Sequence, residues 1–189
     1  MNLNRANAIT IGRILLIPVF IAFALSKIPY GPWLAIAVFS VAAITDGLDG
    51  YYARSRNQVT TLGKLLDPLA DKLLITAALV SLVDLNKLSA WIAVVIIGRE
   101  FAVTTLRIVA VDQGVVIPAS GLGKIKTIVQ ISCIIELLFP HEQLWGPLWY
   151  APWVDGLTVA LMVTVTLLSG AQYFLRARDR LSAPTTPPA

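Results

Sequence analysis

The chain has 189 residues, of which 57% are hydrophobic and 14% charged, and its mean hydropathy is +0.75. Ordinary soluble domains carry roughly 25% charged residues, so this composition predicts a protein that is built for lipid. The single cysteine excludes an internal disulfide and a multi-cysteine metal site, and the single histidine excludes a histidine-based metal centre.

Six apolar stretches approach the length of about 20 residues that a transmembrane helix needs. They cover residues 8–26, 33–54, 62–83, 88–111, 122–139 and 154–175, and turn-like segments separate them. We therefore predict an all-α membrane bundle of six transmembrane helices. It forms one domain over residues 1–178, followed by a proline-rich, disordered tail over residues 179–189.

Basic residues set the expected orientation. With six spans, both termini face the same side of the membrane, and the loops on the opposite side hold only Lys27 and Lys87 as basic residues. The positive-inside rule then places both termini in the cytoplasm and the protein in the inner membrane of a cell. The basic residues expected on the cytoplasmic side are Arg5, Arg13, Arg54, Arg56, Lys64, Lys72, Arg107, Lys124, Lys126, Arg176, Arg178 and Arg180.

Four carboxylates lie at the cytoplasmic ends of the second and third spans: Asp46, Asp49, Asp67 and Asp71. On helices, the spacings of three and four residues project each pair from one face. An ionised group at membrane depth is costly unless it is paired or binds a cation. Oxygen ligands at this density suit Mg²⁺ or Mn²⁺, with two ions as one possibility. The alternative is a set of salt bridges with neighbouring basic residues.

The residues beside these carboxylates are small. Gly50 and Ala53 share the helix face of Asp46 and Asp49, so a flat group such as a nucleotide could approach the backbone there. Gly63 leaves similar room on the facing helix. Close packing of two membrane helices is the competing explanation for the three small residues.

The pattern Asp46-x2-Asp49-Gly50-x2-Ala53-Arg54-x8-Gly63-x3-Asp67-x3-Asp71 resembles the signature of the CDP-alcohol phosphotransferase family. The resemblance implies that Asp46, Asp49 and Asp67 are the principal ligands of two Mg²⁺ or Mn²⁺ ions. It also implies that Asp71 is the base that deprotonates the acceptor alcohol, with a contact to the second ion. By the same resemblance, Gly50, Ala53, Arg54 and Gly63 seat the CDP-linked lipid, and the protein is a homodimer.

Asn7, Thr10 and Arg13 follow one another at intervals of three along the first span. They resemble the Asn-x-x-Thr-x-x-Arg opening of bacterial family members that use glycerophosphate, although Ala6 stands where many of those have proline. The resemblance implies contacts of Asn7 and Thr10 with the nucleotide and of Arg13 with the acceptor. As alternatives, Asn7 and Thr10 could cap the helix, and Arg13 could reach along it to the interface.

A further basic set comprises Arg107, Lys124 and Lys126, preceded by the adjacent Arg99 and Glu100 in the fourth span. We expect Glu100 to pair with Arg107, on the same helix face, or with other neighbours. The three basic residues could form a pocket for an acceptor that carries its own phosphate. Alternatively, they could only anchor helix ends, and Arg99 could be either a ligand or a structural ion-pair partner.

The order Arg-Glu-x6-Arg, followed by Gly-Lys-x-Lys-Thr, is similar to the phosphatidylglycerophosphate synthases within this family. That similarity implies CDP-diacylglycerol and sn-glycerol 3-phosphate as substrates, with phosphatidylglycerophosphate and CMP as products. The alternatives are a sister enzyme that uses inositol phosphate, serine or a lipid as acceptor, and a divalent-cation transporter. Membrane lipid is an expected partner, and nucleic acid is not.

Overall fold

The computed structural model describes the backbone of residues 5–55, 61–113, 115, 121–141 and 153–181. Side chains are described for these residues except in 5–9, 46–55, 61–69, 71 and 181. The side chains of all four motif aspartates therefore lie outside the described part.

The described residues form six α-helices, and each predicted apolar stretch corresponds to one of them. The helices are α1 (Arg5–Ala24), α2 (Gly31–Ser55), α3 (Thr61–Asp84), α4 (Ala90–Asp112), α5 (Gly121–Leu138) and α7 (Trp153–Leu181). The prediction of an all-α fold is confirmed. Helix α7 continues beyond the predicted end of the last span at residue 175 and beyond the predicted domain boundary at 178, and residues 182–189 of the predicted tail lie outside the description.

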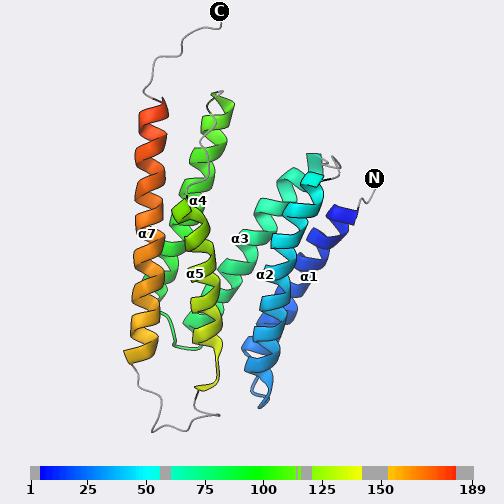
Figure 1. Cartoon of the computed structure of the whole chain (residues 1–189). Helices are drawn as coiled ribbons and strands as arrows, with labels where there is room; N and C mark the ends of the chain where they lie inside the picture. Colours follow the sequence, from blue (N-terminus) through cyan, green and yellow to red (C-terminus); the bar gives the residue numbers. More distant parts are fainter. Residues whose placement is uncertain (1–4, 56–60, 114, 116–120, 142–152, 182–189) are drawn as a thin grey trace, which may run out of the picture.

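Successive helices run in opposite directions along the bundle (Figure 1). The helices α1, α2 and α3 pack together, α4 and α5 pack against α7, and α3 contacts α4 and α5 across the two groups. The first turn of α1 and the last turn of α7 lie at the same end of the bundle, shown at the top of Figure 1. The ends of α2 and α4 and the beginnings of α3 and α5 lie toward the same end.

The turn between α3 and α4 has a defined chemical cause. Asn86 adopts a left-handed conformation with φ of 56°, which asparagine tolerates better than most residues. The amide of Lys87 donates to the Leu82 carbonyl at 2.9 Å, and the amide of Asn86 donates to the Val83 carbonyl at 3.0 Å. This is a Schellman ending for α3. The Lys87 ammonium group also donates to the Leu137 carbonyl at 2.7 Å, which ties the turn to the end of α5.

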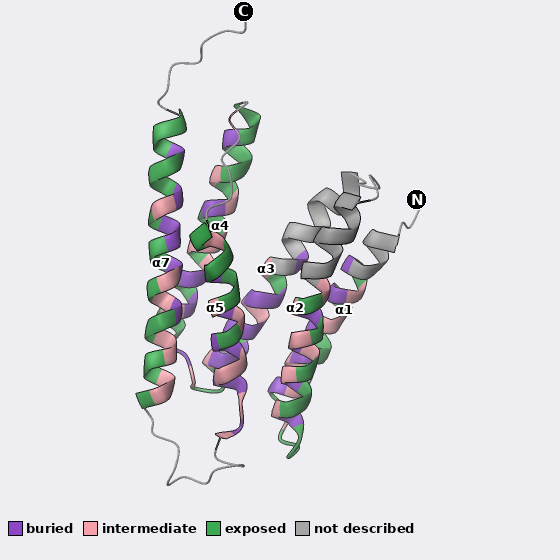
Figure 2. Ribbon diagram, viewed as in Figure 1, coloured by how far each residue is buried: buried purple, intermediate pink, exposed green. Residues whose placement is uncertain are grey.

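The main apolar core joins all six helices in the half of the bundle away from the termini (Figure 2). Phe20 of α1 and Phe39 of α2 are fully buried there, with ring centroids 5.6 Å apart. Ile96 of α4 and Ile134 of α5 close the core on its other side. Because this core fixes the helices at one end, polar side chains can be accommodated between them nearer the other end.

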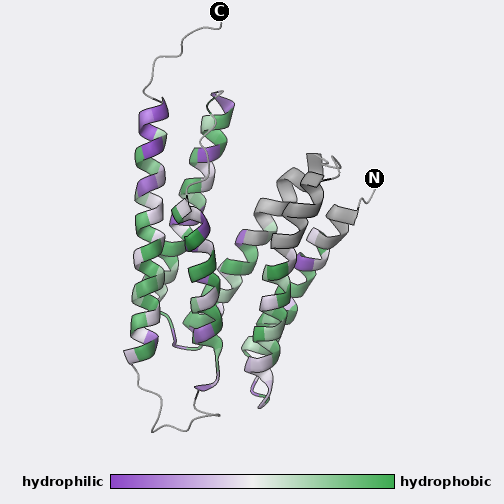
Figure 3. Cartoon of the chain, viewed as in Figure 1, coloured by the Kyte–Doolittle hydropathy of each residue, from purple (hydrophilic) through white to green (hydrophobic). Residues whose placement is uncertain are grey.

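Large apolar side chains are also exposed on every helix, including Leu15 (65%), Ile128 (66%) and Leu168 (59%). Within the described residues, one helix, Trp153–Arg180, is long and apolar enough to cross a membrane by itself, with a mean hydropathy of 1.7. The apolar stretches Thr10–Ala24 and Gly31–Thr45 are shorter. Figure 3 shows the apolar residues concentrated along the middle of the helices. The full set of six spans stays a prediction.

Candidate functional site

The acidic motif occupies two neighbouring helices. Asp46 and Asp49 belong to the last three turns of α2, whereas Asp67 and Asp71 belong to the first half of α3. The helices contact each other, and these parts of both lie toward the end of the bundle that carries the termini (Figure 1). The backbone thus brings the two acidic segments to the same end of adjacent helices, as the motif requires.

Several predicted site residues have side chains outside the described part. Besides the four aspartates, these are the residues assigned to the nucleotide and its lipid: Asn7, Gly50, Ala53, Arg54 and Gly63. Among the side chains that are described, no three of the types His, Cys, Asp and Glu come together to hold a metal ion. The metal ligands and the base therefore stay predictions.

On α1, Thr10 and Arg13 are buried, with exposed fractions of 1% and 2%. Because α1 is already helical from Arg5, Thr10 is too far inside the helix to be its cap. The burial of Arg13 argues against the interfacial alternative, since a snorkelling side chain keeps its charged end in water. Arg13 borders an apolar cavity of about 320 Å³ between α1 and α2, together with Gly12, Leu16, Ala42 and Thr45. The contact of Thr10 with the nucleotide and the contact of Arg13 with the acceptor stay predictions.

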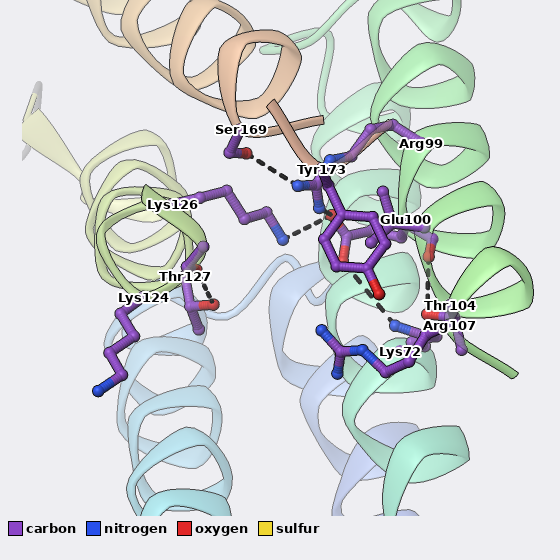
Figure 4. A pocket seen from close by; sticks show the side chains of 12 residues that line it. Lys72, Arg99, Glu100, Thr104, Arg107, Lys124, Lys126, Thr127, Ser169 and Tyr173 are labelled. Atoms are coloured by element: carbon purple, nitrogen blue, oxygen red, sulfur yellow. Dashed lines mark hydrogen bonds and ion pairs between the residues drawn. The ribbon is translucent and has the colours of Figure 1, made fainter. Parts of the chain in front are cut away.

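A second cavity, of about 260 Å³, lies between α3, α4, α5 and α7, and we call it the cationic pocket (Figure 4). Five of its lining side chains are basic and one is acidic. The lining residues are Lys72, Arg99, Glu100, Val103, Thr104, Arg107, Gly123, Lys124, Lys126, Thr127, Ser169 and Tyr173. At neutral pH, the ionised lining side chains therefore carry a net positive charge, which suits an anionic ligand.

Glu100 is the centre of the ion pairs in this pocket. Its Oε1 atom lies 2.6 Å from Nζ of Lys126 and 2.9 Å from Nη1 of Arg99. Its Oε2 atom lies 3.9 Å from Nζ of Lys72, so one carboxylate from α4 holds basic side chains of α3, α4 and α5. The expectation that Glu100 pairs with neighbouring bases is confirmed, and Arg99 has the ion-pair role that was one of its two alternatives.

Arg99 also connects α4 to α7. Its Nη2 atom donates to Oγ of Ser169 at 2.8 Å, and Ser169 donates in turn to the Thr166 carbonyl at 3.0 Å. Gly170 allows this close approach, because a Cβ atom there would lie 3.1 Å from both Cγ and Nε of Arg99. The Arg99 guanidinium group is therefore held by the Glu100 carboxylate and the Ser169 hydroxyl, and its side chain packs against Gly170.

Three of the four residues predicted to bind the acceptor phosphate line the cationic pocket, namely Arg107, Lys124 and Lys126. The fourth, Arg13, borders the other cavity. Lys126 is buried and paired with Glu100, whereas Arg107 and Lys124 are exposed and have no carboxylate partner among the described residues. The Cζ atom of Arg107 lies 5.6 Å from the centroid of the Tyr173 ring, within the range of a cation–π contact.

Sequence reasoning did not find Lys72, Ser169 and Tyr173 as pocket residues. Lys72 could have been found from the sequence, because it directly follows the motif residue Asp71. Ser169 and Tyr173 are four residues apart in an otherwise apolar helix, so they share a face, and Gly170 beside them marks a close helix contact. What the sequence could not show is which helices that face meets.

The sequence profile of the CDP-alcohol phosphatidyltransferase family matches residues 3–171. A CDP-diacylglycerol–glycerol-3-phosphate 3-phosphatidyltransferase of Bacillus subtilis is 44% identical over 190 residues, which cover 94% of this chain and 97% of the relative. A probable phosphatidylglycerophosphate synthase of Mycobacterium tuberculosis is 39% identical, with 92% and 81% covered. A CDP-diacylglycerol–glycerol-3-phosphate 3-phosphatidyltransferase of Shigella flexneri is 35% identical, with 96% and 98% covered.

Among solved structures, the apo crystal structure of phosphatidylinositol phosphate synthase from Mycobacterium tuberculosis is similar in fold. It superposes with a TM-score of 0.65 at 18% sequence identity, over 94% of this chain and 93% of that one. The helices described above are therefore arranged as in a known membrane enzyme.

Proposed function

This chain belongs to the CDP-alcohol phosphatidyltransferase family, and from that premise we infer that it has phosphatidylglycerophosphate synthase activity. It transfers the phosphatidyl group of CDP-diacylglycerol to sn-glycerol 3-phosphate and releases CMP. The observation that carries this conclusion is the identity of 35–44%, over nearly the whole chain, to enzymes named for this reaction. The protein is thus a transferase of phosphatidylglycerol biosynthesis in a family of membrane enzymes.

The cationic pocket supports a phosphorylated acceptor. Arg107 and Lys124 line the pocket, are exposed to solvent and have no carboxylate partner among the described residues. Guanidinium and ammonium groups pair strongly with phosphate oxygens, and arginine can do so with two parallel hydrogen bonds. We assign the acceptor phosphate to these two side chains first. Lys126 contributes through its charge, whereas the fourth predicted contact, Arg13, lies on α1 beside the other cavity.

The chemistry requires a new bond between the primary hydroxyl oxygen of the acceptor and the phosphorus that carries the diacylglycerol. The bond from that phosphorus to the bridging oxygen breaks, and CMP leaves with the electron pair. We assign the hydroxyl proton to the Asp71 carboxylate, one residue before the pocket residue Lys72 on α3. A general base must lie within hydrogen-bond reach of that proton.

The donor set of the acidic motif fits a divalent metal, because it consists of carboxylates alone on the facing ends of α2 and α3. Asp46, Asp49 and Asp67, with Asp71, would hold two Mg²⁺ or Mn²⁺ ions. Such ions neutralise pyrophosphate charge and stabilise the departing phosphate. Asn7, Thr10, Gly50, Ala53, Arg54 and Gly63 would bind the nucleotide and its lipid from α1, α2 and α3.

The expected membrane arrangement places all six helices across the inner membrane, with the termini and the active site on the cytoplasmic side. Two features support it. The first turn of α1 and the last turn of α7 lie at one end of the bundle (Figure 1), and the cationic pocket is lined in part by the first two turns of α5, which begins toward that end. This position lets a lipid substrate with an interfacial head group meet a water-soluble phosphate ester. The catalytic domain extends over residues 1–178, and the working unit is a homodimer.

The test is CMP release by the purified full-length protein in detergent micelles with CDP-diacylglycerol and Mg²⁺. The acceptors are sn-glycerol 3-phosphate, inositol phosphate, serine and a lipid alcohol, each supplied alone. We expect CMP and phosphatidylglycerophosphate to form in equal amounts with sn-glycerol 3-phosphate alone. Turnover with a different acceptor and none with sn-glycerol 3-phosphate would contradict the proposal in favour of a sister enzyme.

A further inference from the structure

Tyr173 has a buried hydroxyl group whose role the ion pairs of the pocket do not explain. The residue lines the cationic pocket, only 4% of it is exposed, and its hydroxyl has no hydrogen-bond partner among the described residues. Figure 4 shows the ring extending from α7 into the space beside Glu100, with its hydroxyl on the side of Lys72 and Arg107. A buried polar group without a partner is destabilising, so a partner supplied by a ligand is expected to bind strongly.

The other hydroxyl groups of the pocket already donate to the backbone. Thr104 donates to the Glu100 carbonyl at 2.8 Å, Thr127 to the Gly123 carbonyl at 3.2 Å, and Ser169 to the Thr166 carbonyl. The basic side chains can donate hydrogen bonds but cannot accept them. Both oxygens of Glu100 are engaged by basic side chains. Tyr173 is therefore the pocket side chain whose hydroxyl remains able both to donate and to accept.

Because Tyr173 lies beside Arg107, its hydroxyl can reach only the part of a ligand that is close to the phosphate. Arg107 stacks on the Tyr173 ring, and we have assigned the acceptor phosphate to Arg107 and Lys124. In sn-glycerol 3-phosphate, the carbon next to the phosphorylated one carries the secondary hydroxyl. That group takes no part in the transfer, and it needs one partner that accepts and another that donates. The Tyr173 oxygen is buried in this structure, so a ligand can reach it only when neighbouring pocket side chains move.

We propose that the phenolic hydroxyl of Tyr173 binds the secondary hydroxyl of sn-glycerol 3-phosphate, and so selects this acceptor over phosphorylated alcohols that lack the group. The proposal rests on the function inferred above. It makes Tyr173 a specificity-determining residue and leaves the phosphate to the basic side chains. The ring itself stays in contact with Arg107 whether or not the hydroxyl is present.

The experiment combines one substitution in the protein with one change in the acceptor. The full-length wild-type protein and the Tyr173→Phe variant are each assayed with sn-glycerol 3-phosphate and with 3-hydroxypropyl phosphate, which lacks only the secondary hydroxyl. CMP release at saturating CDP-diacylglycerol gives kcat/KM for each acceptor. The matched control is Tyr30→Phe, because Tyr30 lies 74% exposed just before α2, at the other end of the bundle.

The expected result is that wild-type kcat/KM is about tenfold higher with sn-glycerol 3-phosphate than with the analogue, as for loss of a hydrogen bond at a buried group. Tyr173→Phe lowers kcat/KM about tenfold with sn-glycerol 3-phosphate and leaves it unchanged with the analogue. An equal loss with both acceptors, or no loss with either, overturns the proposal.

Equal wild-type kcat/KM values for the two acceptors would also overturn the proposal. This comparison uses the wild-type protein alone, so it does not depend on whether a variant folds. A wild-type protein that is inactive with sn-glycerol 3-phosphate but active with another acceptor contradicts the inferred function instead. The two failures are therefore separate results.

Discussion

The two polar regions of this bundle balance charge in opposite ways. The acidic motif places four carboxylates on neighbouring segments of α2 and α3. The cationic pocket gathers five basic side chains from α3, α4 and α5 around a single carboxylate, Glu100. Each region carries an excess of one sign of charge, which is costly in a membrane-type fold unless something of the opposite sign offsets it.

This difference is the basis on which we propose a separate substrate for each region. An excess of carboxylates needs cations, and divalent ions bring with them the pyrophosphate of a nucleotide-linked lipid. An excess of basic groups needs an anion, and in our proposal this anion is the phosphate of the acceptor. Lys72 connects the regions, because it follows Asp71 on α3 and lies 3.9 Å from Glu100.

The largest expected effect is loss of turnover when divalent ions are removed. A chelator should abolish CMP release, because the carboxylates of the acidic motif cannot bind a pyrophosphate without cations between them. Added Mg²⁺ or Mn²⁺ should restore the reaction with the same protein sample. Undiminished turnover in the presence of the chelator would contradict a metal-binding role for the acidic motif.

The next effect is that of Asp71→Asn, which keeps the shape of the side chain and removes its basicity. We expect kcat to fall about 10²–10⁴-fold, the usual contribution of a general base. CMP release at saturating concentrations of both substrates measures it. The matched control is Asp84→Asn, which changes an exposed aspartate at the other end of the same helix and should leave kcat unchanged. Equal rates for the two variants would remove Asp71 from catalysis.

A smaller effect, on stability, is expected for Glu100→Gln. The substitution removes the charge of the carboxylate that Lys126 and Arg99 contact, and the Lys126 side chain is only 7% exposed. Breaking such a buried pair costs about 3 kcal/mol, which should lower the unfolding temperature by roughly 6–12 °C. Thermal unfolding of the protein in detergent micelles checks this.

The control for that measurement is Asp179→Asn. Asp179 is 70% exposed and lies 3.7 Å from Arg178, and exposed pairs of this kind contribute at most about 1 kcal/mol. Its unfolding temperature should stay close to the wild-type value. If Glu100→Gln were as mild as this control, Glu100 would not be the structural centre of the pocket.

The smallest effect compares two glycines in long helices. At Gly170, an added Cβ atom would press on Arg99 at 3.1 Å, whereas at Gly98 no neighbouring atom lies within 4 Å. Gly98→Ala should stabilise its helix by about 0.5–1 kcal/mol, because alanine is the better helix former. Gly170→Ala should lose that gain as Arg99 shifts away from Ser169. Equal unfolding temperatures for the two variants would mean that Arg99 can move away from residue 170 at no cost in stability.

The helices could be predicted closely because their cause is local. Predicted and observed ends of the first five helices differ by at most three residues, since apolar stretches end where polar turns begin. The exception is the end of α7, where the helix continues through Arg176, Arg178 and Arg180 to Leu181 (Figure 3). Hydropathy predicts where lipid contact ends, and a helix can extend beyond that point into water.

The site could be predicted only in part, because pairing between helices depends on their rotation and packing. The sequence placed Arg107, Lys124 and Lys126 near one another, and the structure brings all three to one pocket. It left open whether Glu100 pairs with Arg107 or with other bases. The choice of Lys126 follows from the way α5 faces α4, which no spacing within either helix encodes.

The division between the two polar regions is tested most directly by the KM values of an Arg107→Ala, Lys124→Ala double variant for each substrate. We predict that KM for sn-glycerol 3-phosphate rises at least about tenfold, since charged hydrogen bonds to phosphate contribute about 1.5–3 kcal/mol each. The KM for CDP-diacylglycerol should stay within about twofold of the wild-type value, because loss of acceptor contacts leaves its site intact. A rise in KM for CDP-diacylglycerol, with KM for sn-glycerol 3-phosphate unchanged, would contradict the account.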